Sequence, residues 1–123
     1  MASLLGSTCV WAVGLGPLQK SGVTAGPDKG FYLTITNPYP AARKFRAYVE
    51  PDTGIEASRV SILPAETAIA AGSSRRILVI IHSLTQGEEV QFRVCAEKVE
   101  TGKVSIHARV CSRLGARRLR TAR

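Results

Sequence analysis

The sequence contains few of the residues that mark special protein classes. Its 123 residues include three cysteines, one tryptophan and only six other aromatic side chains. No apolar run reaches the roughly 18 residues that a membrane-spanning helix needs. Hydrophobic residues make up 45% of the chain, which excludes the disordered and collagen-like classes. The length fits a single domain with one core.

Sequence signals for catalysis are also missing. The chain has two histidines, His82 and His107, and it has no Gly-flanked serine elbow, no phosphate-binding loop and no cluster of carboxylates. Glu88 and Glu89 are adjacent, so on a strand they would point to opposite faces and could not share a proton. We therefore expect a protein that is not an enzyme and that uses no cofactor.

Acidic residues are absent from the end of the chain. From Ser105 onward there are six arginines and no acid, so this segment carries most of the net charge of +8 and leaves +2 on the rest. The sequence predicts a basic C-terminal tail over residues 114–123. This tail is either simply solvated or in contact with nucleic acid, an anionic lipid surface or an acidic partner. The six arginines are Arg109, Arg113, Arg117, Arg118, Arg120 and Arg123.

Residues 1–12 contain no charged side chain. Val10-Trp11-Ala12 has small or modest residues at the positions that a signal peptidase reads, although a positively charged start and a full apolar region are missing. One interpretation is the remnant of a secretory signal whose true start lies upstream of Met1. The alternative is a buried or frayed first strand.

What the sequence does contain is alternation of apolar and polar residues. Segments 31–36, 44–50, 59–63 and 90–97 each place their apolar residues on one face, as half-buried strands do. The stretch from Pro64 to Ile81 is the most informative, because a Gly-Ser-Ser turn leads into five consecutive branched aliphatic residues. A run that short between turn signals predicts a buried strand.

Together with an irregular first strand over 13–23 and a last strand that includes Val104 to Val110, these segments predict about seven strands. Seven short alternating strands in about 100 residues are typical of an immunoglobulin-like antiparallel β-sandwich. We expect this all-β sandwich to occupy residues 13–113.

Cys95 and Cys111 fall on the polar faces of the last two expected strands, so they can meet across an antiparallel pair. The expected three-residue turn at Glu100-Thr101-Gly102 opposes this pairing, because it sets His107 opposite Cys95 and leaves the cysteines four residues out of step. A longer loop or a bulge would restore them. A disulfide and two free thiols both remain open. A metal site of Cys95, His107 and Cys111 would lack a fourth ligand, and we expect none.

The order of these segments resembles the N-terminal domain of the PapD-like periplasmic pilus-assembly chaperones. The matching segments read LTITNPYP, KFRAYVEPDTG, VSILPAETAIAAGSSRRILVII and EEVQFRVCAE, followed by one more alternating strand. The resemblance covers about Val13 to Arg113, and some of its motifs recur in the related major sperm protein domains. It implies a periplasmic location. Some family members also carry a disulfide between the same two strands, and the chaperones have a second sandwich domain after the final strand.

The resemblance also implies a function. The chaperones lend an edge strand to a pilin subunit that lacks its last strand, so that backbone hydrogen bonds supply affinity and alternating side chains fill pockets. They also hold the terminal carboxylate of the client with one cation on the first strand and one on the last. The residues for strand donation would be Val104, Ile106, Ala108 and Val110. The residues for the carboxylate anchor would be Lys20 with Arg109 or Arg113.

Other interpretations remain open for each of these residues. The alternative for the four apolar residues of the last strand is that they face only the domain's own core, and the alternative for the three cations is that they are ordinary solvated charges. Three kinds of function follow: a module that binds a pilin-like subunit or another incomplete sandwich, a scaffolding sandwich that forms homo-oligomers through an edge strand, and a basic-tailed domain that contacts nucleic acid or an anionic surface.

Overall fold

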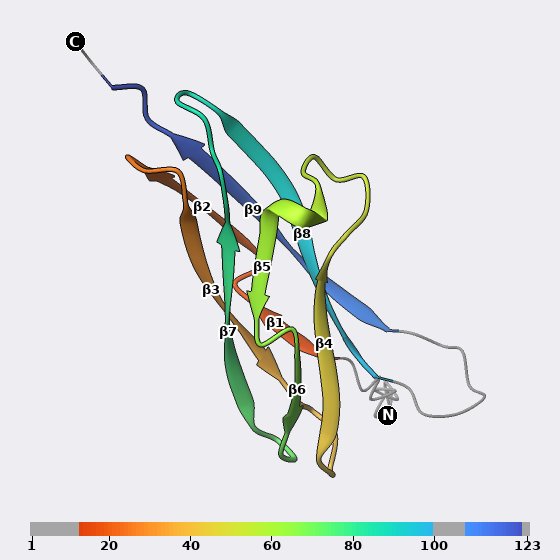
Figure 1. The fold of residues 1–123 in the computed structure, drawn as a ribbon. Coiled ribbons are helices and arrows are strands. Elements are labelled where there is room, and N and C mark those ends of the chain that lie inside the picture. The colour runs from red at the N-terminus through yellow and green to blue at the C-terminus, as the bar shows by residue number, and fades with distance from the viewer. Residues whose placement is uncertain (1–12, 100–107, 122–123) are drawn as a thin grey trace, which may run out of the picture.

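The computed structural model describes residues 13–99 and 108–121 and shows two β-sheets packed face to face (Figure 1). The four-stranded sheet has the order β1 (Gly14–Gly16), β3 (Lys29–Thr36), β7 (Ser74–Ile81), β5 (Val60–Leu63). The five-stranded sheet has the order β2 (Gln19–Thr24), β9 (Arg109–Arg118), β8 (Glu89–Lys98), β4 (Arg43–Val49), β6 (Glu66–Ile69). The only helical element in these residues is a 3-10 turn, Ala57–Arg59. These residues contain no helix with the length and apolar character needed to cross a membrane. The expected all-β sandwich is confirmed.

The core lies between the sheets and is built from the expected alternating faces. Phe31, Leu33 and Ile35 of β3 are at most 2% exposed, and Phe92 and Val94 of β8 are equally buried. Successive strand residues point to opposite faces, so the polar residues between them face water. The period-2 pattern therefore assigns these residues to the correct side of each sheet.

The first expected strand is two strands in different sheets. β1 pairs antiparallel with β3, whereas β2 pairs parallel with β9. Pro17 lies between them and has no N–H to continue the β1 ladder, so the chain leaves one sheet there and enters the other. The sandwich is antiparallel, as expected, in its other strand pairs, and β2 with β9 is a parallel pair at this edge. β6 is a further strand that the sequence pattern did not separate from the turn before β7.

The last strand extends further than expected. β9 runs to Arg118, with Leu114 and Ala116 almost completely buried. Inward Leu114 and Ala116 alternate with outward Arg113 and Arg117, which is strand patterning that the surplus of arginine obscured. The boundary of the basic tail at residue 114 is therefore wrong. β9 is also an internal strand along Arg113–Arg118, where β2 covers it, rather than an edge throughout.

The pairing of β8 with β9 differs from the register that a three-residue turn would give. Cys95 lies opposite Cys111, and Glu97 lies opposite Arg109. The placement of His107 opposite Cys95 is therefore wrong, because the connection between the two strands is longer than three residues. Residues 1–12, which include the proposed signal remnant, and residues 100–107, which include Val104, Ile106 and His107, lie outside the described residues.

Candidate partner-binding site

Among the described residues, the first half of β9 has an open backbone edge. The Arg113 N–H donates to the Leu18 carbonyl at 2.8 Å, so the backbone polar groups of Arg113 face the β2 side. Alternate residues of a strand direct these groups to the same side, so Cys111 and Arg109 also direct theirs away from β8. The pairing of β2 begins at Arg113. Within the described chain no strand pairs with this side of β9 at residues 109–112.

Two candidate anchor residues lie at the point where this open edge ends. Lys20 and Arg113 line one shallow hollow of about 210 Å³, together with Gln19, Ser21 and Gln91. Lys20 stands on β2 in register with Leu114, next to the pair of Gln19 and Arg113. Neither cation has a side-chain hydrogen bond or ion pair with another described residue. Both charges are therefore available to an anionic group of a ligand.

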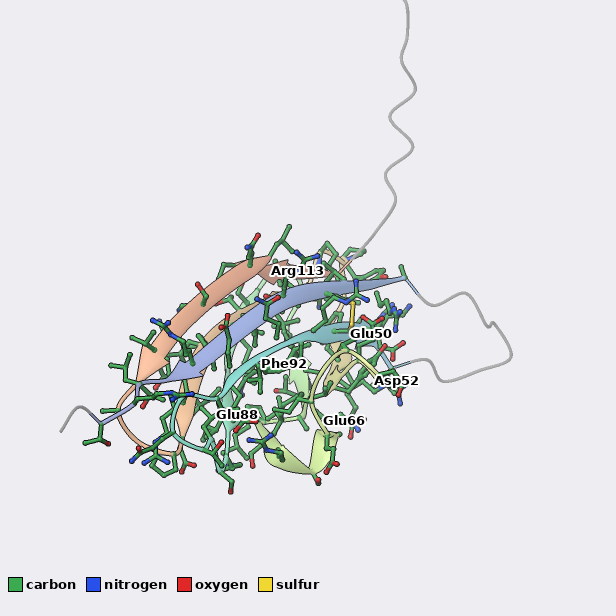
Figure 2. The ribbon with its side chains drawn as sticks, turned by 90° about the horizontal axis from the view of Figure 1, so that it is seen from above. Glu50, Asp52, Glu66, Glu88, Phe92 and Arg113 are labelled. Atoms are coloured by element: carbon green, nitrogen blue, oxygen red, sulfur yellow. A yellow bond between two sulfur atoms is a disulfide. The ribbon has the colours of Figure 1, made fainter. Side chains whose placement is uncertain are left out.

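Arg109, the third candidate, is already engaged. Its guanidinium donates to the Tyr48 hydroxyl at 3.2 Å and lies 3.5 Å from Glu50 Oε1. The hydrogen bond to Tyr48 and the attraction of Tyr48 and Glu50 raise the pKa of Arg109. Lys20 and Arg113 thus line one hollow from adjacent register positions, whereas Arg109 is directed toward β4. Figure 2 shows Arg113 on the outward side of β9.

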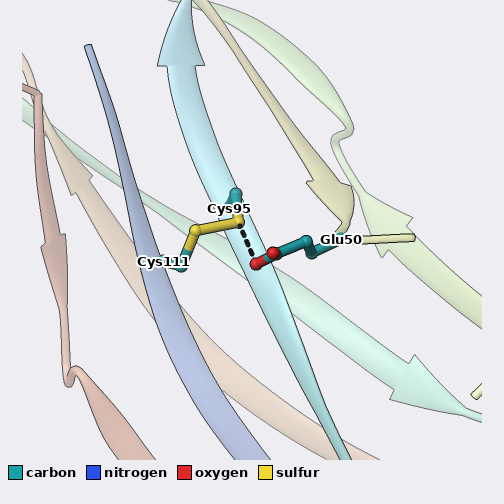
Figure 3. Close-up of side chains that lie close together, drawn as sticks. All are labelled: Glu50, Cys95 and Cys111. Carbon is teal, nitrogen blue, oxygen red and sulfur yellow. Dashed lines mark hydrogen bonds between the residues drawn. A yellow bond between two sulfur atoms is a disulfide. The ribbon is translucent and has the colours of Figure 1, made fainter. Parts of the chain in front are cut away.

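A disulfide and an acid stand beside the open edge. Cys95 and Cys111 are bonded, as one of the two sequence alternatives proposed. Glu50 Oε2 lies 3.5 Å from Cys95 Sγ (Figure 3). Glu50 also forms an ion pair with Arg93 at 3.0 Å. The two sulfur atoms and one Glu50 oxygen are close enough to suggest three metal ligands, but both sulfurs are used in the bond. The cluster joins β4, β8 and β9 on their outer face.

The expected strand-donation residues are only partly described. Val110 is half-buried and packs against the core, which fits the alternative that it serves this domain's own core. Ala108 is exposed and directly precedes β9. Val104 and Ile106 fall outside the described residues.

The sequence missed several members of this site. Tyr48 and Glu50 face outward on and after β4, where they meet Arg109, but β4 and β9 are separated by β8, so no local spacing relates them. The parallel pairing of β2 with β9 was likewise not evident. Outward polar residues at alternate positions of segment 44–50 were the one signal that could have indicated Tyr48 and Glu50.

Comparison with known proteins identifies the fold. No protein-family model and no curated protein sequence matches the chain. The periplasmic chaperone SfaE matches with a TM-score of 0.66 and 17% identity, over 87% of this chain and 58% of its own. The Salmonella enterica SafB chaperone in complex with SafA pilin matches with a TM-score of 0.68 and 17% identity, over 91% of this chain and 57% of its own. A PapD-like domain of human CEP192 matches with a TM-score of 0.69 and 10% identity, over 99% of this chain and 95% of its own.

These likenesses show a PapD-like fold, as the sequence resemblance implied. The chain spans little more than half the length of the chaperones it matches, and nearly all of the CEP192 domain. It therefore corresponds to one domain of the longer chaperones.

Proposed function

We propose that this domain binds a protein partner by pairing the open edge of β9 with a strand of that partner. The observation that carries the proposal is the open edge at Arg109–Ser112, which ends at two cations without described partners. Unpaired N–H and C=O groups along a strand are a template for strand addition. The partner would be a pilin-like subunit or another incomplete β-sandwich.

The position of β2 supports one direction for the added strand. β2 runs parallel to β9 and starts at Gln19, so a partner strand beside Arg109–Ser112 would lie end to end with β2. A terminal carboxylate held by Lys20 and Arg113 must come from the end nearest β2. The partner strand would then run toward β2, parallel to β9.

The comparisons support a protein partner in general terms. SafB was solved in complex with a pilin, and that chaperone shares this fold. SfaE is described as periplasmic, and the Cys95–Cys111 disulfide suits an oxidising compartment. We therefore propose the periplasm as the location and chaperone-like subunit binding, without catalysis, as the activity of this edge.

A proline substitution tests the role of the open edge. The Arg109 N–H points away from β8, so Arg109→Pro removes a donor on the open side and leaves the β8 ladder intact. Arg109→Ala is the matched control, because it removes the same contacts to Tyr48 and Glu50. The probe is a fluorescent peptide of alternating valine and serine with a free C-terminal carboxylate, and binding is measured by anisotropy.

We expect Arg109→Ala to bind the peptide nearly as well as the wild type. Arg109→Pro should bind about tenfold more weakly, which corresponds to the loss of one backbone hydrogen bond and its geometry. Equal binding by the two variants would show that this edge is not the binding element. If the protein instead forms homo-oligomers that Arg109→Pro dissolves, the edge serves self-assembly.

A further inference from the structure

Three polar side chains on the four-stranded sheet have the order of a nucleophile, a base and an acid. Ser61 Oγ lies 2.8 Å from His82 Nε2. His82 Nδ1 in turn lies 3.6 Å from Asp28 Oδ1. Ser61 is on β5, His82 directly follows β7, and Asp28 directly precedes β3. These residues are far apart in the sequence, so only the fold reveals the arrangement.

The backbone that carries His82 is held from several sides. Arg59 donates to the carbonyls of His82 and Ser83 at 3.3 and 3.0 Å, and it forms an ion pair with Glu88 at 2.9 Å. The Ser83 N–H donates to Asp28 Oδ1 at 3.3 Å, which ties the loop before β3 to the segment after β7. A reactive group needs such support, because its geometry must be fixed before the substrate arrives.

A hydrogen-bond donor lies next to the serine. The His82 N–H donates to the Arg59 carbonyl, so Arg59 and His82 are a hydrogen-bonded pair of the antiparallel β5–β7 ladder, and Ser61 with Ile80 is the next such pair. Ile62 therefore directs its N–H away from β7, to the side of β5 on which no described strand pairs. This N–H of the residue after the serine can stabilise negative charge that develops on a carbonyl oxygen.

Apolar side chains border the serine on the same outward face. Leu63 lies opposite Leu78, and Tyr32 lies opposite Leu78 from the other side. Leu63 is 56% exposed and Tyr32 is 53% exposed. Leu63, Leu78 and Tyr32 form an apolar row across β5, β7 and β3, next to the cross-strand pair of Ser61 and Ile80.

We propose that Ser61 is a nucleophile activated by His82 and that it reacts with small activated esters that have an apolar acyl group. The serine is half-buried on an open sheet surface, so the substrate must be small enough to react without a deep pocket. The site is separate from the β9 edge and does not depend on the partner binding proposed there.

The reaction follows from the positions of the three groups. Ser61 Oγ attacks the ester carbonyl as its proton passes to His82 Nε2, and Asp28 stabilises the resulting imidazolium. The new O–C bond forms, the bond to the alcohol oxygen breaks, and the alcohol leaves with the proton from His82. Water then attacks the acyl group, gives its proton to His82, and Ser61 is restored as the acid leaves.

A fluorophosphonate probe tests the proposal directly. In this reaction the bond between Ser61 Oγ and phosphorus forms, fluoride leaves, and His82 takes the hydroxyl proton. We expect mass spectrometry of the digested wild-type protein to place the adduct on Ser61. Labelling should be lost in Ser61→Ala and unchanged in Ser58→Ala, which removes an exposed serine nearby. Hydrolysis of p-nitrophenyl acetate, measured in parallel, should likewise be lost in Ser61→Ala and unchanged in Ser58→Ala.

The role of His82 is tested by His82→Gln, which keeps a polar group beside Ser61 but removes the base. Labelling should slow by about 100-fold or more, and Asp28→Asn should cause a smaller loss. Circular dichroism checks that each variant stays folded. The position of the adduct is determined on the wild-type protein and so does not depend on the folding of any variant. An adduct absent from Ser61, or a rate unchanged in folded His82→Gln, would overturn the proposal.

Discussion

Asn37 shows how one polar residue can hold a turn in a sandwich of this size. Its side chain is completely buried. Its Nδ2 group donates to the carbonyls of Ala41, Ile69 and Ala70 at 2.9 to 3.2 Å, and its Oδ1 accepts the Tyr39 N–H at 2.8 Å. One amide therefore satisfies the backbone where β3 ends and where β6 ends.

Replacing this amide should destabilise the domain strongly. Asn37→Ala leaves buried carbonyls without their donor, and we expect a loss of about 2–4 kcal/mol in the free energy of unfolding. Urea denaturation should show a lower midpoint with an unchanged slope. Gln91→Ala, at an exposed position, should change stability by less than about 0.5 kcal/mol. Equal small effects would mean that water replaces the Asn37 bonds.

Glu88 links stability to pH at the residue scale. Its two oxygens accept hydrogen bonds from Arg59 at 2.9 Å, and the Thr85 N–H adds another. The Arg59 hydrogen bond, followed by that from Thr85, lowers the pKa of Glu88 from 4.5 to about 2. Between these values the unfolded chain binds a proton that the folded chain does not. The stability that Glu88 contributes is therefore present above about pH 5 and lost as the pH falls toward 2.

The comparison of Glu88→Gln with the wild type isolates this effect. At pH 7 the variant should be less stable by about 1–2 kcal/mol, since the ion pair is partly solvated. The difference should shrink as the pH is lowered from 5 to 2 in chemical denaturation experiments. Glu89→Gln, at the exposed neighbouring position, should show no such trend. A difference that stays constant with pH would contradict the depressed pKa.

At the scale of strands, the sequence predicted which residues face the core, because this depends on local alternation. It did not predict strand pairing and register, because these depend on residues distant in the sequence. The faces of β3 and β8 follow from a period of two, because half-buried strands impose it. The split between β1 and β2 depends on which distant strand each half meets. The register of β8 and β9 depends on the length of their connection, and a Gly-containing segment suggested a turn that was too short.

The candidate site was predicted to a similar degree. The sequence indicated the two cysteines by their shared face, and the structure bonds them. Lys20 and Arg113 were named by resemblance, and their role stays a prediction. Tyr48 and Glu50 were not indicated, because they come from β4, with β8 between it and β9. The Ser61, His82 and Asp28 cluster joins three separate elements and has no sequence signature.

The disulfide should stabilise the β8–β9 pair measurably. It closes a sequence separation of 16 residues, which in the chain-entropy account is worth about 3 kcal/mol. In a Cys9→Ser background, thiol titration of the unfolded, unreduced protein should find no free thiol. Replacing Cys95 and Cys111 with alanine should lower the free energy of unfolding by up to that amount. Two free thiols in the oxidised preparation would contradict the bridge.

At the scale of the whole molecule, the two sheets separate two kinds of surface. The five-stranded sheet has the half of β9 that no described strand covers, with Lys20 and Arg113 at its end. The four-stranded sheet has the apolar row and the serine cluster on its outward face. β2 links the fold to the proposed function, because it covers one half of β9 and thereby leaves a short edge with a defined end.

The exchange of individual backbone amides tests strand addition at β9 most directly. Isotope-labelled protein is mixed with the carboxylate-terminated valine–serine peptide, and amide hydrogen exchange is followed by NMR. The account predicts that the Arg109 and Cys111 amides become protected, and that an amidated peptide or the Lys20→Ala/Arg113→Ala variant weakens this protection. Peptide binding that protects amides on β5 or β6 and leaves Arg109 and Cys111 unchanged would contradict it.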